Sequence, residues 1–338
     1  YSLSRRDFPF NIDQISIGDV ETSANSGEEG ESGRAAWIGQ AKYNYDNKYY
    51  VEASFRRDGS DKFAPGKRWG TFFSGSLGWV VTAEEFMQPL VEKNILNSLK
   101  LRASYGETGQ DSGIGSFAYM TSYGFNAYAY VVNGSYVPGF TEGAMPSPDL
   151  TWYTTKQFDL GFDFASLNSR LYGSFDYFYY STKGYLQTPT GVTYLNTALG
   201  LSMPMVKSDS EHRRAGTEIQ LGWRDNIGDF KYDVSANFTY FDQLWALNRS
   251  ESENSYMNPY QRTQQQKGYY GLLYHNLGFY TTTDDVYNSV GIVSSLRSGN
   301  LLPGDLKYQD MNGDGKIDSQ DYRRLGKSGA PRGQFGIN

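Results

Sequence analysis

Hydrophobic and polar residues alternate with a period of two in eight stretches of the chain. In one stretch Phe158, Leu160 and Phe162 alternate with Gln157 and Asp159. Successive side chains of a β-strand point to opposite faces of the sheet, so this pattern predicts strands with one apolar and one polar face. The predicted strands cover residues 36–46, 48–57, 69–81, 98–106, 155–165, 169–180, 215–224 and 230–241.

The length of these strands distinguishes two kinds of β protein. Each predicted strand has about 9–13 residues, whereas strands of soluble sandwiches usually have about 5–6. A tilted strand that crosses a bilayer needs about 9–11 residues. The polar faces carry Lys, Arg, Asp and Glu, which tolerate a water-filled lumen but not lipid. Both features favour an antiparallel transmembrane β-barrel.

The connections between the predicted strands alternate between short and long. Short turns lie at 46–48, 166–168 and 225–229, and long connections lie at 57–68, 107–154, 181–214 and after Phe241. Alternate connections of an antiparallel meander lie at the same end, so the short turns share one rim and the long loops share the other. Outer-membrane barrels have short periplasmic turns and long extracellular loops. Residues 82–98 form an intermediate connection, for which we expect a short helix.

A large soluble β-sandwich or lectin-like domain is the alternative that the pattern leaves open. Loops longer than about 15 residues are uncommon in compact domains, which favours the barrel. Aromatic residues near the strand ends, such as Tyr49, Tyr50 and Tyr240, fit the aromatic girdles of a barrel. The same residues also fit ordinary cross-strand pairing.

Composition narrows the class of protein further. The mean hydropathy of -0.60 resembles that of a soluble protein, but a barrel with half-polar strands gives a similar value. No apolar run reaches the roughly 18–20 residues of a membrane-spanning helix, so any crossing is by strands. The net charge of -6 without a basic run gives no support for nucleic-acid binding. The absence of Cys excludes thiol catalysis and Cys-based zinc sites.

The segment DMNGDGKIDSQD, residues 310–321, follows the loop pattern of an EF-hand calcium site. Calcium prefers clustered hard oxygen ligands from a flexible loop with a glycine at position 6, here Gly315. The predicted ligands are the side chains of Asp310, Asn312, Asp314, Asp318 and Asp321 and the carbonyl of Lys316. Position 12 is an aspartate instead of the usual glutamate, and flanking helices are not evident. An Asx-rich turn without an ion is the alternative.

The tyrosine-rich segment YGFNAYAYVVNGSYVPGF, residues 123–140, is a candidate binding surface. Flat aromatic rings can stack on sugars or peptides. The candidate substrate-binding residues are Tyr123, Phe125, Tyr128, Tyr130 and Tyr136. The alternative is a loop that buries its own tyrosines.

Catalytic constellations are absent from the sequence. The two histidines, His212 and His275, lie far apart in expected loops and outside any metalloprotease motif. No carboxylate pair stands out for glycoside cleavage, although separated loops can in principle supply one. We therefore expect no enzyme, and a β-rich glycoside hydrolase or lyase is only the third hypothesis.

Two blocks of the sequence resemble the barrels of SusC/RagA-type TonB-dependent transporters of Bacteroidetes. The first block is KYNYDNKYYVEASFRRDGSDKFAPGKRWGTFFSGSLGWVVTAEEFM followed by LKLRASYGETGQ. It has the tyrosine-rich strand, the R-x-DGS loop and the R-W-G strand of that family. The second block is PGDLKYQDMNGDGKIDSQDYRRLG, which is similar to a late segment of the family and precedes a new strand.

The resemblance implies import of oligosaccharides or oligopeptides across the outer membrane through a 22-stranded barrel. It also implies an N-terminal plug, energy from the TonB complex through a TonB box, and a SusD-like surface lipoprotein as a lid. The plug, the TonB box and the early and final strands are not in the sequence, so we interpret the chain as an internal barrel fragment. Residues 310–321 would lie on the extracellular side, where calcium is available to a weak loop site.

We therefore predict an all-β protein with a preceding segment at 1–35 and a barrel segment at 36–338. An extracellular, calcium-loop-like segment lies at 304–326, and no cofactor is required apart from calcium in that loop. The alternative function is a calcium-stabilised soluble or surface carbohydrate-binding β domain. The environment of five apolar residues separates the two, since they face lipid in a barrel and a shared core in a soluble domain: Leu101, Phe158, Phe162, Leu221 and Phe238.

Overall fold

The computed structural model describes residues 32–143, 145–187, 203–266, 271–292, 300–324 and 331–338. Contacts divide the chain into Tyr1–Arg34 and Ala35–Asn338, and the following description concerns the second unit. The predicted preceding segment at 1–35 lies almost entirely outside the described residues. No helix of the described residues is both long enough and apolar enough to span a membrane.

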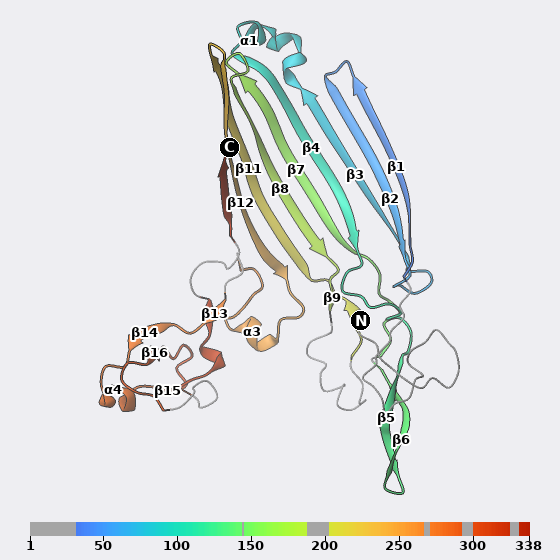
Figure 1. Ribbon diagram of the computed structural model, residues 1–338, viewed down its shortest axis with the longest axis vertical. Coiled ribbons are helices and arrows are strands. Elements are labelled where there is room, and N and C mark those ends of the chain that lie inside the picture. The colour runs from blue at the N-terminus through green and yellow to red at the C-terminus, as the bar shows by residue number, and fades with distance from the viewer. Residues whose placement is uncertain (1–31, 144, 188–202, 267–270, 293–299, 325–330) are drawn as a thin grey trace. The chain divides into compact units, whose positions relative to one another are not determined.

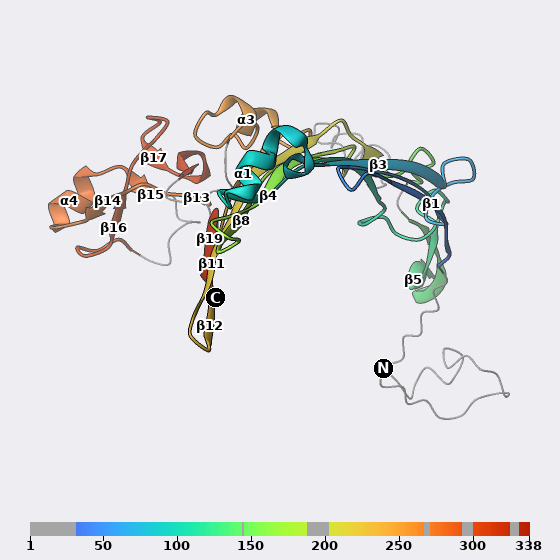
Figure 2. The same cartoon turned by 90° about the horizontal axis from the view of Figure 1, so that it is seen from above.

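Nine strands form one hydrogen-bonded sheet in the order β1-β2-β3-β4-β7-β8-β11-β12-β19 (Figure 1). The strands are β1 (Arg34–Tyr45), β2 (Tyr49–Ser60), β3 (Trp69–Val80), β4 (Leu96–Gln110), β7 (Tyr153–Ser166), β8 (Leu171–Lys183), β11 (Glu211–Ile227), β12 (Phe230–Leu247) and β19 (Gly333–Ile337). From β2 onward every neighbouring pair is antiparallel. Seen from above, the sheet is curved (Figure 2).

All eight predicted strands are confirmed, and the short strand β19 follows the second family-like block as expected. Several strands are longer than the alternation predicted: β4 begins at Leu96 and ends at Gln110, and β11 begins at Glu211. Residues at these strand ends are still hydrogen-bonded to their neighbours although the apolar alternation has stopped. The ladder therefore continues beyond the band that the hydrophobic pattern marks.

The short turns follow directly from the local sequence. Asp46 and Asn47 both have a φ of 53°, and the Lys48 amide donates to the Tyr45 carbonyl at 3.0 Å. A two-residue hairpin loop with positive φ at both positions matches the twist of the flanking strands, and Asn and Asp tolerate this conformation. The connection from β3 to β4 contains η3 (Val81–Ala83), η4 (Glu85–Met87) and α1 (Gln88–Glu92), which confirms the expected helix.

The long connections contain small elements of their own. The connection between β4 and β7 folds as the hairpin β5 (Tyr123–Val132) and β6 (Ser135–Glu142), where the sequence had suggested only a loop. Its turn residues Asn133 and Gly134 have φ of 52° and 80°. Asn-Gly between apolar runs is a strong hairpin signal, so this element could have been predicted. The strands β9 (Leu186–Gln187) and β10 (Val206–Lys207) pair in the next connection.

The connection between β12 and β19 folds back on itself. It contains α3 (Glu253–Met257) and α4 (Thr283–Asn288). Its short strands are β13 (Leu272–Leu273), β14 (Asn276–Phe279), β15 (Gly291–Ile292), β16 (Leu306–Tyr308), β17 (Lys316–Ile317) and β18 (Arg323–Arg324), and the turn η6 (Ser319–Asp321) follows β17. The pairs are β13 with β18, β14 with β16, and β15 with β17. The described residues of the segment 304–326 thus belong to this set of paired short strands between β12 and β19, here called the loop module.

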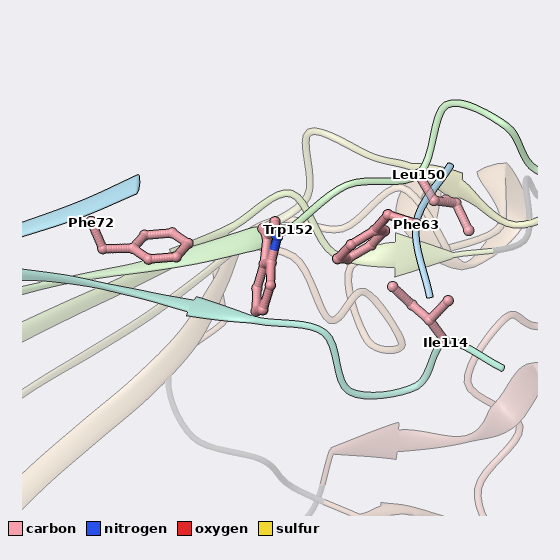
Figure 3. Packing of buried hydrophobic residues seen from close by; sticks show 5 residues of the cluster. All are labelled: Phe63, Phe72, Ile114, Leu150 and Trp152. Carbon is pink, nitrogen blue, oxygen red and sulfur yellow. The ribbon is translucent and has the colours of Figure 1, made fainter. Parts of the chain in front are cut away.

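Buried apolar residues are concentrated where loops meet strand ends (Figure 3). Phe63, Phe72, Ile114, Leu150 and Trp152 form one cluster, in which the ring centroids of Phe63 and Trp152 are 5.4 Å apart. The Trp152 indole donates to the Arg68 carbonyl at 2.9 Å. This cluster fastens the connections that follow β2 and β4 to the start of β7, while the middle of the sheet has no such core among the described residues.

Candidate functional site: the two faces of the strand wall

One face of the sheet carries an uninterrupted apolar band. The strand register aligns one row of residues across eight strands: Tyr49, Trp79, Leu101, Phe162, Phe175, Ile219, Phe238 and Phe335. Single exposed apolar residues are normal in soluble proteins, but a contiguous band of this size marks a surface that another apolar medium covers. The outward face of a membrane barrel is such a surface.

The five residues chosen to separate a barrel from a soluble domain all lie on this face. Leu101, Phe158, Phe162, Leu221 and Phe238 are 36–48% exposed. Within the described part of the chain, no second sheet packs against them to form a shared core. The arrangement contradicts the soluble β domain and agrees with strands that contact lipid.

The opposite face of the same strands is polar. The row next to the apolar one consists of Tyr50, Gly78, Arg102, Gly161, Asp176, Glu218, Thr239 and Gln334. Apart from Tyr50, this row consists of glycines and of hydroxyl, amide and charged side chains, where the other row is apolar and aromatic. This composition is typical of a hydrated lumen, where water and ion pairs satisfy polar groups.

Arg102 lies at the centre of the polar face. Its guanidinium donates to the Asp163 oxygens at 2.8 and 3.0 Å and to Asp176 at 3.1 Å. Gly161 stands between Arg102 and Asp176 in the register, and a methyl group added there would overlap the Asp176 carboxylate. Glycine at this position therefore permits the ion pair to cross β7. One arginine thus pairs with two carboxylates, and it holds Asp163 through two parallel hydrogen bonds.

A hollow of about 410 Å³ opens on the polar face beside this network. Its charged lining residues come from β1, β2, β4 and β7: Lys42, Glu52, Lys100, Arg102 and Asp159. Lys42 and Glu52 form an ion pair at 3.4 Å across the first two strands. Both cationic and anionic groups line the hollow, so it can hold a polar solute without a strong preference for one sign of charge.

The aromatic residues predicted to bind substrate lie on the hairpin β5–β6. Tyr123, Phe125, Tyr128, Tyr130 and Tyr136 are 59–71% exposed, which contradicts the alternative of a loop that buries its own tyrosines. The register places Tyr123, Phe125 and Tyr136 on one face, and Tyr130 on the other.

Aromatic rings of this hairpin also contact each other. Phe125 and Phe140 meet edge to face at 5.9 Å between centroids, and Tyr128 and Tyr136 meet edge to face at 5.3 Å. Edge-to-face pairs are a preferred aromatic geometry and leave ring faces accessible. The structure thus presents the predicted residues as a surface, and substrate binding by them stays a prediction.

Two glycines of the predicted calcium loop have a left-handed backbone conformation. Gly313 and Gly315 have φ of 74° and 82°, a conformation that glycine adopts without strain. The Asp310 carboxylate accepts from the Gly313 and Gly315 amides at 2.6 and 2.8 Å. These amides hold the pKa of Asp310 below its usual range, with Gly315 contributing most. The amides of the loop therefore favour the charged form of this carboxylate.

The other predicted ligands are also engaged within the loop. Asp321 is fully buried and accepts from the Met311 and Asp318 amides at 2.7 and 2.8 Å. The Lys316 ammonium lies 3.8 Å from Asp314 and 3.3 Å from Asp318. Within the described residues, no three His, Asp or Glu side chains are grouped like the ligands of a metal ion. Residues 310–321 form an Asx-rich turn, and calcium binding by it stays a prediction.

The two histidines are confirmed as separate, but only His275 lies in a loop. His212 belongs to β11 and packs against Trp245 with ring centroids 5.0 Å apart. The Nδ1 atom of His275 is 2.7 Å from the Gln309 amide oxygen within the loop module. Both rings have structural neighbours, and neither is part of a nucleophile–base arrangement in the described residues.

The family model of the TonB dependent receptor-like beta-barrel matches residues 3–326 of the chain. The chain belongs to this family. The TonB-dependent receptor SusC of Bacteroides thetaiotaomicron is 27% identical over 292 residues, which are 85% of this chain and 27% of that protein. The TonB-dependent receptor P39 of Formosa agariphila is 28% identical and matches 84% of this chain and 29% of that protein.

A solved structure of the RagAB peptide importer in a closed-closed state has the same fold. The TM-score is 0.68 with 20% sequence identity, and the match covers 96% of this chain and 34% of that chain. The chain thus spans about a third or less of the relatives it matches. The expected resemblance to SusC/RagA-type transporters is confirmed, and the sheet is part of an outer-membrane β-barrel. The apolar band faces lipid, the polar face lines the lumen, and the long loops are extracellular.

Two features of the polar face were not singled out from the sequence. Arg102, Asp163 and Asp176 alternate correctly along their own strands, but their mutual contacts depend on the register between strands. Nothing in the sequence around Gly161 indicates its role, because that role depends on Asp176 in the neighbouring strand. Register is a property of strand pairs, so no single stretch of sequence contains it.

Proposed function

We propose that this chain forms part of the wall of an importer that takes oligosaccharides or oligopeptides across the outer membrane. The complete transporter would work with a SusD-like surface lipoprotein and draw energy from the TonB complex. The observation that carries the proposal is the segregation of the two faces, with the apolar row and the polar row on the same strands. A barrel of this kind gives hydrophilic solutes a hydrated path through lipid.

The polar face favours passage over covalent chemistry. Arg102 with Asp163 and Asp176, and Lys42 with Glu52, neutralise much of each other's charge. A solute that crosses such a surface meets hydrogen-bonding groups without a deep electrostatic well. Weak, distributed contacts of this type suit a protein that must release its ligand on the other side.

The hairpin β5–β6 is proposed as an extracellular contact for the substrate. It lies in the connection between β4 and β7, which belongs to the long-loop rim. Its exposed Tyr128 and Tyr136 rings could stack on a sugar ring or on apolar parts of a peptide. SusC and P39 are TonB-dependent receptors and RagAB is a peptide importer, which supports energised import without selecting between sugars and peptides.

The proposal is tested in cells that carry the complete natural transporter. Uptake of labelled neutral oligosaccharides and oligopeptides is measured in the wild type, in a deletion strain and after addition of a protonophore. We expect uptake of one class to depend on the gene and to stop when the proton gradient collapses. Co-purification of a lipoprotein with the tagged transporter is the parallel measurement. Uptake that is equal in the deletion strain for every compound would refute import as the function.

A further inference from the structure

A second group of lumenal residues lies at the extracellular ends of β8, β11 and β12. The register aligns three rows there: Thr182 with His212 and Trp245, Tyr180 with Arg214 and Gln243, and Phe178 with Gly216 and Phe241. All nine residues lie on the polar face, on the same side as Asp176 and Glu218. This patch combines aromatic rings with a guanidinium, whereas the Arg102 region combines guanidinium with carboxylates.

Arg214 is held flat by its neighbours. Its guanidinium carbon lies 3.9 Å from the centre of the Phe241 ring. Gly216 makes this possible, because a Cβ at that position would come within 2.5 Å of the Phe178 ring and 2.7 Å of the Phe241 side chain. A guanidinium stacked on an aromatic ring keeps its N–H donors free in the plane of the fork. The side chain is nevertheless exposed.

Other arginines of the polar face already have carboxylate partners. Arg102 pairs with Asp163 and Asp176, and Arg56 pairs with Asp58 at 2.7 Å. Arg224 is also stacked, 4.1 Å from the Tyr172 ring, but it lies 4.0 Å from Asp233.

For Arg214, the described residues provide no carboxylate within ion-pairing distance, and its register partners Tyr180 and Gln243 are uncharged. A solvated, preoriented fork that has no carboxylate partner among the described residues is suited to an anion from outside the chain.

The surroundings of Arg214 provide flat surfaces for the rest of such a ligand. Trp245 is half-buried and packs on Tyr185 with ring centroids 5.1 Å apart. Tyr185 in turn stacks on Tyr153 at 5.6 Å. Binding sites for small ligands usually combine aromatic walls with a few oriented polar groups, and this patch has both.

We propose that Arg214 is the carboxylate-recognising residue of a subsite at the extracellular mouth of the lumen. The ligand chemistry is a carboxylate next to a flat or apolar unit, as in a uronic acid residue of an oligosaccharide or the terminal carboxylate of a peptide. The inference rests on the proposed function, because it needs this face to line a solute path. It adds a preference for acidic substrates over neutral ones of the same size.

The experiment uses the complete natural transporter with its partner lipoprotein, purified in detergent. Calorimetry compares oligogalacturonate with its methyl ester, and an oligopeptide with its C-terminal amide. The variants are Arg214→Gln, Arg214→Lys and Phe241→Leu. Arg224→Gln is the matched control, since Arg224 lies on the same strand and face and is also stacked.

We expect Arg214→Gln to weaken binding of the acidic member of one pair by about tenfold or more, since it removes hydrogen bonds to a charged group. The neutral member should bind unchanged. Arg214→Lys keeps the charge and loses the planar fork, so it should give an intermediate loss. Phe241→Leu should weaken only the acidic member, and the control should change neither. The pair that responds identifies the source of the carboxylate.

Two results would overturn the proposal. One is a wild-type transporter that binds acidic and neutral members alike or binds neither acid. The other is a loss in Arg214→Gln that is equal for both members of a pair. Neither result contradicts uptake of neutral oligomers in cells, which is the test of import. Failure of the subsite is therefore distinguishable from failure of the import function.

Discussion

The nine-stranded sheet, here called the wall, and the long loops of this chain are stabilised in different ways. In the wall, the backbone ladder joins nine strands, while side chains such as Phe162 and Phe238 remain exposed on the apolar face. In the loop module after β12, Tyr280, Ile317 and Asp321 are almost completely buried. The wall relies on lipid to cover its apolar residues, whereas the loops must build small cores of their own.

The side chains of the two regions are therefore constrained in different ways. On the wall, each residue belongs to one of two faces, and its role follows from the medium that the face contacts. In the loops, each residue is fixed by specific partners, as Asp321 is fixed by the Met311 and Asp318 amides. In the wall, the effect of a substitution on stability should therefore depend on the face to which the residue belongs. In the loops, it should depend on the individual contacts that are lost.

The largest effect is expected from a charge on the lipid face of the wall. Ile219 and Gln220 are neighbours on β11 that point to opposite faces. Ile219→Arg should destabilise the folded barrel by about 2–4 kcal/mol if it lies near the middle of the bilayer, whereas Gln220→Arg should have little effect. Both variants are made in the complete transporter, and unfolding by denaturant is followed in lipid vesicles. Equal destabilisation would show that the two faces do not contact different media.

A smaller effect is expected inside the polar face, at Gly161. Gly161→Ala forces the Asp176 carboxylate away from Arg102 and leaves part of a half-buried ion network unsatisfied. A loss of about 1–3 kcal/mol in the free energy of unfolding is the expected result. Gly75→Ala is the control, since the atom nearest to the added methyl group there is the Glu52 carbonyl oxygen at 3.5 Å. Thermal unfolding that is identical for both variants would contradict the role of Gly161.

The aromatic hairpin should respond through ligand binding, not through the stability of the wall. Tyr128→Ala and Tyr136→Ala each remove an exposed ring, and a loss of about two- to tenfold in substrate affinity is expected for each. Val132→Ala, on the opposite face of the hairpin, is the control. The melting temperature should stay constant in all three variants. Unchanged affinity in both tyrosine variants would remove the hairpin from the proposed binding surface.

Calcium should act only on the loop module. If residues 310–321 bind the ion, adding calcium should slow proteolysis of this module, and Asp314→Ala should abolish the effect. Lys316→Gln is the second variant, because it removes the ammonium that lies near the predicted ligands Asp314 and Asp318. Metal content and protease resistance that are the same in the wild type and in Asp314→Ala would leave the segment as an Asx-rich turn.

The smallest effect concerns acidity in the same module. The Lys307 ammonium, 2.7 Å away, lowers the pKa of Asp285 to about 2, and the Thr281 amide adds to this. A depressed carboxyl pKa stabilises the folded module above the unfolded value of about 3.9, and this contribution is lost as the pH falls toward 2. Protease resistance of the module should therefore fall between about pH 4 and pH 2. Asp285→Asn should flatten this dependence, while a profile identical to that of the wild type would refute the assignment.

The sequence predicts the wall better than the site. Period two along each strand is a local property, and it located the eight principal strands and their two faces. The ends of β4 and β11 were missed because pairing continues after the apolar alternation stops. The hairpin β5–β6 was missed although Asn133 and Gly134 are a recognisable turn pair.

Contacts across strands could not be derived in the same way. The contact between Arg102 and Asp176 needs both the register of three strands and a glycine between them. The stacking of Arg214 on Phe241 likewise requires a residue without a side chain at position 216, which is Gly216. The calcium-like motif shows the reverse case: its residues are adjacent in sequence, so its conformation was predictable, while the presence of an ion depends on solution conditions.

The order of the strands in the sheet is their order along the chain, and the connections range from the tight turn at Asp46 and Asn47 to the whole segment between Leu247 and Gly333. For a flexible loop, each doubling of length raises the entropic cost of closure by only about 0.6 kcal/mol. Insertions on the extracellular rim are therefore nearly neutral for the assembly of the wall. One barrel scaffold can diversify its ligands by lengthening and exchanging loops while the strands, held by lipid and by their ladder, stay unchanged.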